Sequence, residues 1–275
     1  MIMEERVIRE VEKLLQQAGE GILGVYHSGR FNTFQKTDMS PVTEADHLSS
    51  KTINHGLNIL FPGIPVIDEE NPIPAYSERM DWSHYFLLDP LDGTREFLKR
   101  NGEFCINLAL MEHNRPVASW IYQPAGSRGW YCIKGSGLRE FGGRVAEMAN
   151  RENGKRLRLI TSRSHTPAKG YAFFDEISKR YDLEIIRLGS ALKQVEVALG
   201  FSGLYVRGSG CSEWDTAAGH LMVEEAGGAV LQWDMDSTLF YNKPGLKNPP
   251  FVMMSEYWQT VEFKEFIKSV LPRGM

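Results

Sequence analysis

Hydrophobic residues recur at helical spacing through the first sixty positions of the chain. The series that starts at Val7 and Val11 predicts an amphipathic helix over residues 4–26. A second series follows Thr43, a residue type that caps helices, and stops at a Pro-Gly break. Acidic residues favour the first turn of a helix, so helix capping by itself explains much of the placement of Asp46.

Shorter apolar runs of β-branched and aromatic residues fill the stretch from residue 65 to residue 133. They predict strands, because each run is bounded by residues that favour turns. The predicted strands cover 65–71, 85–88, 104–111, 117–122 and 130–133, with a short helix over 95–99. Consecutive strands joined by short turns predict an antiparallel sheet, in which Trp120, Trp130 and Tyr131 are core or sheet-face aromatics.

Strand and helix patterns alternate in the second half, which predicts a layered α/β unit. Strands are predicted over 156–161, 183–188 and 203–206, and helices over 167–181, 191–199 and 214–228. Asp215 is expected at the N-cap of the last helix, a position that would explain it without any chemistry. The polar stretch before residue 155 predicts two subdomains, 1–155 and 156–275.

The composition argues against a protein that binds long nucleic acids and against one that spans a membrane. With 31 basic and 35 acidic residues the net charge is −4, which gives no basic field for a long nucleic acid. Three cysteines without metal-ligand spacing indicate reduced thiols and favour the cytoplasm. No stretch has the length and apolarity of a membrane span, so any membrane contact would be peripheral, at the cytoplasmic face of the inner membrane.

The richest local chemistry lies in residues 87–97, where an apolar run leads into Asp89 and Asp92. Pro90 restricts Asp89 to extended geometry, and Gly93 allows the backbone to approach an anion. Carboxylates and a carbonyl oxygen suit Mg²⁺, with backbone amides beside them for a phosphate. An EF-hand loop needs alternating ligands, which this spacing does not give. A solvated acidic turn is the alternative that remains.

More acids precede this motif, at positions 68–70. Three adjacent like charges repel one another unless a cation or solvent relieves them, and a metal shared with Asp89 and Asp92 would do so. Solvated acidic loops are common, so these acids alone do not indicate a function. They suggest a metal site only when they are considered together with Asp89 and Asp92. His220 is left without a role, because a single helical histidine is more often packed or solvated.

Three segments carry a family likeness in their residues, order and separation. They are Glu69-Glu70, Asp89-Pro-Leu-Asp-Gly-Thr94 and Trp214-Asp-Thr-Ala-Ala-Gly219. Together they resemble the inositol monophosphatase superfamily of Mg²⁺-dependent, lithium-sensitive phosphatases. Other segments resemble the bacterial 3'(2'),5'-bisphosphate nucleotidases of the CysQ type; these are Ser40–Asp46, Phe97–Phe104, Ser162–His165, Gly189–Lys193 and Leu204–Arg207. The likeness spans nearly the whole chain, although relatives often have a small residue in place of Asp68.

The resemblance implies a fold and a set of site residues. The implied fold is α/β (α+β), a five-layer αβαβα sandwich. Two or three Mg²⁺ ions are implied, with Glu69, Asp89, Leu91, Asp92 and Asp215 as metal ligands. Asp46, Glu69 and Thr94 are the implied catalytic residues, Asp46 and Thr94 orienting the attacking water. The implied substrate contacts are Glu69, Leu91, Asp92, Gly93, Thr94, Ser162, His165, Ser190, Lys193, Arg207 and Asp215.

The expected substrate is a small nucleotide bisphosphate, and the expected reaction is hydrolysis of the 3'-phosphate of adenosine 3',5'-bisphosphate to AMP in sulfur metabolism. Lys193, a hydroxyl and free amides near Ser190 would converge on the 5'-phosphate. An inositol or sugar monophosphatase is the alternative enzyme, and a protein that binds Mg²⁺ or a nucleotide without turnover is the non-catalytic alternative. The sequence leaves monomer and homodimer open.

Overall fold

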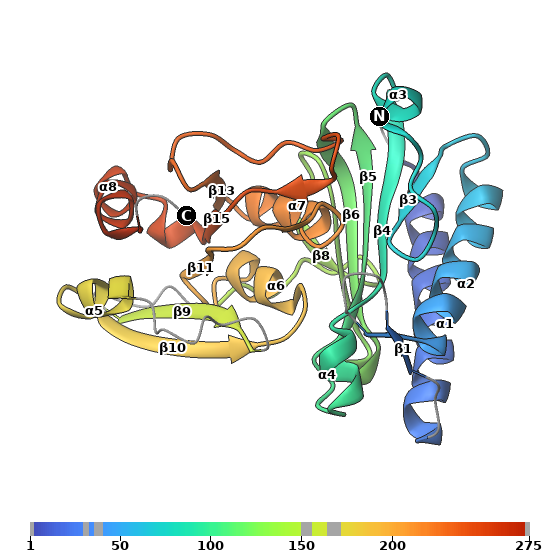
Figure 1. The fold of residues 1–275 in the computed structure, drawn as a ribbon, viewed down its shortest axis with the longest axis horizontal. Coiled ribbons are helices and arrows are strands. Elements are labelled where there is room, and N and C mark those ends of the chain that lie inside the picture. The colour runs from blue at the N-terminus through green and yellow to red at the C-terminus, as the bar shows by residue number, and fades with distance from the viewer. Residues whose placement is uncertain (1–2, 30–32, 36–40, 150–155, 164–171, 273–275) are drawn as a thin grey trace.

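Five layers of helix and sheet follow one another across the molecule, as Figure 1 shows from right to left. The computed structural model describes residues 3–29, 33–35, 41–149, 156–163 and 172–272. Helices α1 (Glu5–Ser28) and α2 (Glu44–Leu60) cover the outer face of the first sheet. Helices α6 (Leu192–Ala198) and α7 (Ala217–Glu225) lie between the two large sheets. The αβαβα sandwich expected from the resemblance is confirmed.

The first sheet has the strand order β3-β4-β5-β6-β7-β8. Its strands are β3 (Val66–Asp68), β4 (His84–Asp92), β5 (Cys105–Glu112), β6 (Arg115–Gln123), β7 (Arg128–Ile133) and β8 (Leu138–Glu140). The short elements beside it are β1 (Thr33–Gln35), β2 (Pro41–Thr43), α3 (Tyr76–Arg79), α4 (Thr94–Leu98) and η1 (Pro124–Gly126). The strands pair antiparallel except at β3, which runs parallel to β4. The antiparallel pairing predicted for the strands between residues 104 and 133 is confirmed. At the other edge β3 runs parallel to β4, because α3 and its flanking loops return the chain to start β4 in the direction of β3.

The second sheet has the order β10-β9-β11-β15-β13. Its strands are β9 (Arg156–Ser162), β10 (Asp182–Leu188), β11 (Leu204–Arg207), β13 (Ala229–Gln232) and β15 (Phe251–Met254). Helices α5 (Ala172–Ser178) and α8 (Val261–Val270) form the outermost layer. The remaining elements are the pair β12 (Cys211–Ser212) and β14 (Lys247–Asn248), and η2 (Glu256–Trp258).

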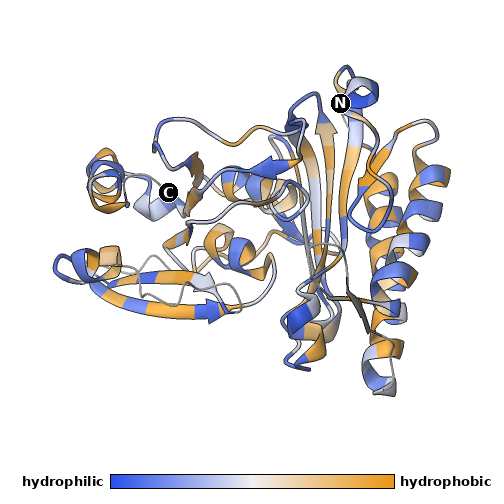
Figure 2. Ribbon diagram, in the orientation of Figure 1, coloured by the Kyte–Doolittle hydropathy of each residue, from blue (hydrophilic) through white to orange (hydrophobic). Residues whose placement is uncertain are grey.

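Three apolar clusters hold the layers together, one under each outer helix layer and one around the middle helices between the two sheets, which explains why the hydrophobic pattern predicts the elements well. Leu15 and Ile22 of α1 are fully buried against the first sheet with Trp120. Phe263 of α8 packs under the second sheet with Leu204. Orange positions accordingly gather on the inward sides of the helices in Figure 2. Burial of such side chains contributes roughly 1.5–3 kcal/mol each, so these layers are fixed mainly by apolar contact.

The ends of two predicted helices can be compared with the structure. The helix predicted over 214–228 is shorter, and Thr216 rather than Asp215 is its N-cap residue, so the N-cap prediction for Asp215 is wrong. Of the helix predicted over 167–181, residues 167–171 lie outside the described part. The subdomain boundary predicted near residue 155 also lies there and stays a prediction. Within the described ranges, no helix has the length and apolarity needed to cross a bilayer.

Candidate active site and metal centre

A cavity of about 330 Å³ opens where the first sheet, α4, α6 and the β12 region meet. Residues of both halves of the chain line it. From the first half come Glu69, Asp89, Leu91, Asp92, Gly93, Thr94, Arg95 and Glu96. From the second half come Ser162, Gly189, Ser190, Lys193, Gln194, Tyr205, Arg207, Ser209, Gly210, Cys211, Ser212, Asp215, Thr216 and Lys247. Nearly every residue expected at the site thus reaches one cavity.

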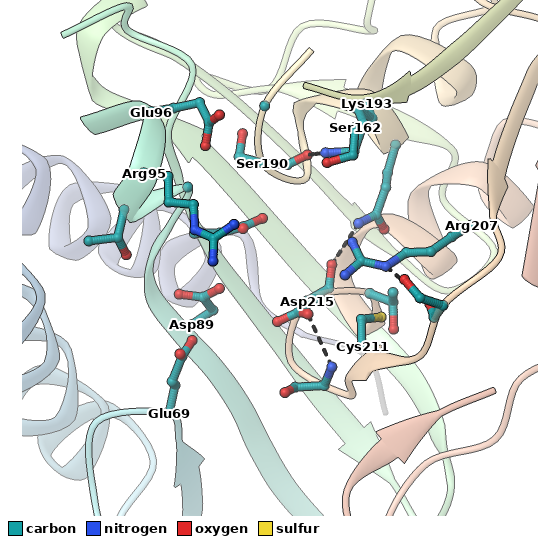
Figure 3. Close-up of a pocket in the computed structure, with 18 of the residues that line it drawn as sticks. Glu69, Asp89, Arg95, Glu96, Ser162, Ser190, Lys193, Arg207, Cys211 and Asp215 are labelled. Carbon is teal, nitrogen blue, oxygen red and sulfur yellow. Dashed lines mark hydrogen bonds between the residues drawn. The ribbon is translucent and has the colours of Figure 1, made fainter. Parts of the chain in front are cut away.

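Three carboxylates gather in this cavity. One oxygen from each of Glu69, Asp89 and Asp215 lies within 4.8 Å of the other two. Figure 3 shows Glu69 and Asp89 pointing toward each other, with Asp215 facing them. Burial, then the charges of Asp92 and Glu69, raise the pKa of Asp215 to about 7. A hard divalent cation bound by oxygen ligands would relieve this crowding of negative charge.

Glu69 reaches the cavity because its neighbour Asp68 is held in the opposite direction. The buried Asp68 carboxylate accepts hydrogen bonds from Ser50 Oγ at 2.6 Å, Asn54 Nδ2 at 2.6 Å and Asn71 Nδ2 at 2.7 Å. Uncharged donors therefore satisfy Asp68, which needs no metal. The structure thus accounts for the residue at which this chain departs from the usual small side chain.

Asp92 lies on the same wall, but part of its carboxylate is already used. Its Oδ2 accepts hydrogen bonds from the Ala191 amide at 2.5 Å and Asn107 Nδ2 at 3.1 Å. Burial raises the pKa of Asp92, while the nearby Lys193 ammonium acts to lower it. The Ala191 amide, expected to be free for a phosphate, instead joins α6 to β4 through Asp92. This leaves the other Asp92 oxygen as the one suited to a cation.

The two carboxylate oxygens of Asp46 accept hydrogen bonds from different parts of the chain. Its Oδ2 accepts from the Thr43 amide at 2.8 Å and Thr43 Oγ1 at 2.6 Å, which completes a capping box at the start of α2. Its Oδ1 accepts from Thr94 Oγ1 at 3.2 Å. Capping and the link to Thr94 are therefore both present, so the two interpretations of Asp46 are compatible.

Asp215 is held in place from the loop before α7. Its Oδ2 accepts from the Ser212 amide at 3.1 Å, and its carbonyl accepts from Gln194 Nε2 at 2.6 Å. Gly219 makes room for that glutamine, because a Cβ on Gly219 would lie 2.1 Å from Gln194 Oε1. The carboxylate thus turns toward the cavity instead of capping α7, and the small residues after Asp215 allow this close approach.

The opposite wall of the cavity carries basic and hydroxyl side chains. Lys193 is only 4% exposed, and its ammonium donates to the Ser190 carbonyl. Burial lowers the pKa of Lys193, and the Asp92 charge raises it. Arg207 Nε donates to the Ser209 carbonyl at 3.4 Å. Figure 3 places Lys193, Ser162 and Ser190 together, with Arg207 beside Asp215. His165, also expected here, lies outside the described residues.

Several residues that line the cavity are not among those expected at the site. Arg95 follows the acidic motif and extends over Asp89 in Figure 3. Lys247 comes from β14, which is far along the chain and contains only two residues. Gln194 lies one turn into α6. Lys247 and Gln194 could only have been found by knowing that β14 pairs with β12 and that α6 packs beside α7.

The chain is similar to known proteins over most of its length. The model of the inositol monophosphatase family matches residues 3–264. The 3'(2'),5'-bisphosphate nucleotidase CysQ of Salmonella typhimurium is 37% identical over 246 residues, 89% of this chain and 98% of that protein. The Escherichia coli K12 protein of the same name is 35% identical, with the same shares covered.

Among solved structures, CysQ of Bacteroides thetaiotaomicron, described as a bacterial member of the inositol monophosphatase family, is 30% identical. It superposes with a TM-score of 0.81 over 92% of this chain and 98% of that chain. The SuhB protein of Bartonella henselae gives a TM-score of 0.80 at 25% identity, over 98% of this chain and 100% of that one. By sequence and by fold, the chain belongs to the inositol monophosphatase family.

Proposed function

We propose that this protein is a Mg²⁺-dependent phosphatase that hydrolyses the 3'-phosphate of adenosine 3',5'-bisphosphate to give AMP and phosphate, a reaction of sulfur metabolism. One observation carries the proposal. A single cavity has carboxylates on one wall and basic residues on the other, so it can hold cations for one phosphate and direct contacts for a second. The names of the similar CysQ proteins support the same substrate class.

The donor set suits Mg²⁺. Its ligands are oxygens, and Glu69, Asp89, Asp92 and Asp215 supply carboxylates with the Leu91 carbonyl beside them. We assign Glu69, Asp89 and Leu91 to a first ion and Asp89, Asp92 and Asp215 to a second, with Asp46 supporting a third. When bound, these ions would neutralise the phosphate, lower the pKa of water and stabilise the leaving alkoxide.

The chain's own residues would orient the nucleophile. Thr94 Oγ1 lies 3.2 Å from Asp46 Oδ1 and 3.3 Å from the Leu91 carbonyl, so its proton is directed toward these oxygens. The lone pairs of the hydroxyl are then available to accept a hydrogen bond from a water molecule. Asp46 therefore fixes the direction in which Thr94 holds that water. An aspartyl-phosphate intermediate is not required, since the spacing of Asp89 and Asp92 differs from that route by one residue.

The second phosphate would lie at the basic wall. We assign Ser162, Ser190, Lys193 and Arg207 to it, together with His165, and Gly93 to close backbone contact with the reacting phosphate. Gly93 has φ +94, and a Cβ there would lie 2.9 Å from the Glu103 carbonyl, so a larger residue would strain this turn.

The three buried, free cysteines support a reducing compartment, the cytoplasm.

Parallel turnover measurements test the function. With Mg²⁺ present, adenosine 3',5'-bisphosphate should be hydrolysed with a kcat/KM at least about tenfold above that for inositol 1-phosphate, because a second charged contact contributes roughly 1.4 kcal/mol or more. Phosphate release from each substrate, with and without a chelator, gives the comparison. Preference for inositol 1-phosphate would instead support the monophosphatase alternative.

Lithium should inhibit the enzyme in roughly the millimolar range, where weakly bound ions compete with loosely held Mg²⁺. A monovalent ion at the second site would neutralise the leaving oxygen poorly. Initial rates at several Mg²⁺ concentrations, with Li⁺ or an equal amount of K⁺, measure this effect. Rates that respond equally to both salts would count against a second ion of this kind.

A further inference from the structure

We propose that Lys247 is a further binding residue for the phosphate that is not hydrolysed, and that it helps the site select nucleotide bisphosphates. The inference rests on the proposed function, which it deepens by adding a specificity residue. Lys247 lines the cavity although it lies 32 positions after Asp215 and outside the motifs that carry the family resemblance.

The backbone of Lys247 is fixed firmly for a residue so close to the surface. It pairs with Ser212 in the β12–β14 ladder, and the next residue, Asn248, pairs with Cys211. Asn248 is 2% exposed, and its Nδ2 donates to the Ser212 carbonyl at 3.2 Å and to Thr216 Oγ1 at 2.6 Å. Lys247 is therefore held beside the loop that carries Asp215, while its side chain is exposed to the cavity.

The Lys247 ammonium keeps donors for an anion. Its Nζ donates to Ser212 Oγ at 2.8 Å, and within the described ranges no carboxylate forms an ion pair with it. Lys243 in the neighbouring loop differs, because its ammonium lies 2.7 Å from Glu213 Oε1. Three N–H bonds and one neutral partner leave Lys247 able to bind a phosphate oxygen.

Ser212 connects this cation to the metal side of the cavity. Its amide holds Asp215 while its hydroxyl accepts from Lys247, which leaves the hydroxyl proton available for the same anion. Arg207 lines the cavity from β11 and contacts Ser209 of the loop that leads into β12. Lys193, by contrast, is buried, and the Asp92 charge beside it balances part of its own. Lys247 is thus the more accessible of these two ammonium groups.

The test compares Lys247→Met with Lys247→Arg and with Lys134→Met, a control at an exposed lysine that does not line the cavity. In Lys247→Met, KM for adenosine 3',5'-bisphosphate should rise on the order of tenfold over the wild type, while kcat for this substrate stays within about twofold. For adenosine 3'-monophosphate, which lacks the second phosphate, kcat and KM should both stay within about twofold of the wild type. Lys247→Arg should retain most of the affinity, because it keeps the charge. Lys134→Met should match the wild type.

Binding without turnover gives a second readout. Titration calorimetry without Mg²⁺ should show AMP binding to Lys247→Met on the order of tenfold more weakly, with adenosine binding unchanged. Equal losses on both substrates, or unchanged AMP affinity, would overturn the role of Lys247 while leaving the proposed function intact. A wild-type enzyme that fails to hydrolyse the bisphosphate would overturn the proposed function itself.

Discussion

Asp89→Asn and Asp92→Asn should each lower turnover by at least about a hundredfold while the protein stays folded. A catalytic metal ion contributes several kcal/mol to transition-state stabilisation, and each 1.4 kcal/mol or so is a factor of ten in rate. Both substitutions remove a charged ligand from a crowded group of acids. The pKa of Asp92 is already raised by burial, which shows that its charge is costly in the protein without metal.

Stability and activity should therefore separate in these variants. Without Mg²⁺, the thermal midpoint of Asp89→Asn should be at or above that of the wild type, whereas Asp92→Asn should gain less because it also removes the charge beside the buried Lys193. In both variants the increase in midpoint on adding Mg²⁺ should shrink. Asp236→Asn is a suitable control, since Asp236 is an exposed acid outside the cavity whose removal should leave turnover unchanged. Near-normal rates with the usual Mg²⁺ dependence in Asp89→Asn would contradict the metal assignment.

Among the variants named here, Arg79→Met should lower the free energy of unfolding most, by about 3 kcal/mol or more. Arg79 is 1% exposed, and its guanidinium donates to the carbonyls of Lys243 at 3.0 Å and Pro244 at 2.7 Å. On the far side of this loop, the buried Glu213 accepts from the Asn242 and Lys243 amides at 2.6 and 3.0 Å. Removing the buried guanidinium takes the donors from these part-buried carbonyls, and hydrogen bonds to a charged group contribute roughly 1.5–3 kcal/mol each.

Urea unfolding measures this loss in the free energy of unfolding. In thermal unfolding the midpoint temperature should fall by about 10 °C, since 1 kcal/mol corresponds to roughly 2–4 °C in a chain of this size. Arg144→Met is the matched control, because the Arg144 side chain is 81% exposed in its ion pair with Glu140. Its effect should stay within about 0.5 kcal/mol. A midpoint for Arg79→Met within 2 °C or so of the wild type would show that the loop does not depend on this arginine.

The layers of the fold could be predicted because apolar periodicity reports burial directly. The spacing of Val11, Leu15 and Ile22 predicts α1 within two residues at each end. The parallel pairing of β3 could not be predicted, because a three-residue strand carries no sign of its direction. Asp215 illustrates a different limit, since an aspartate before a helix fits an N-cap equally well until its contact with Ser212 is known.

The acids of the site could be predicted from the sequence, but among positions 68–70 only the family resemblance, and not the acidic pattern, singles out Glu69. Positions 68–70 look equivalent as a row of acids, yet Asp68 is satisfied by three side-chain donors while Glu69 enters the cavity. Lys247 was missed for a similar reason, because its place depends on a two-residue strand pair. Long-range pairing, which short motifs do not encode, decides both cases.

Under the proposed function, the two sets of hydrogen bonds of the Asp46 carboxylate would link the folding of the first turn of α2 to the alignment of the nucleophile. Whenever the first turn of α2 frays, Oδ2 loses Thr43 and the carboxylate gains freedom to rotate, so Thr94 loses its fixed acceptor in the same event. Amide hydrogen exchange at the start of α2 would then follow the fraction of molecules with a misaligned threonine. Under the proposed function, fraying of this helical turn would then limit the fraction of molecules that can align the attacking water at any instant.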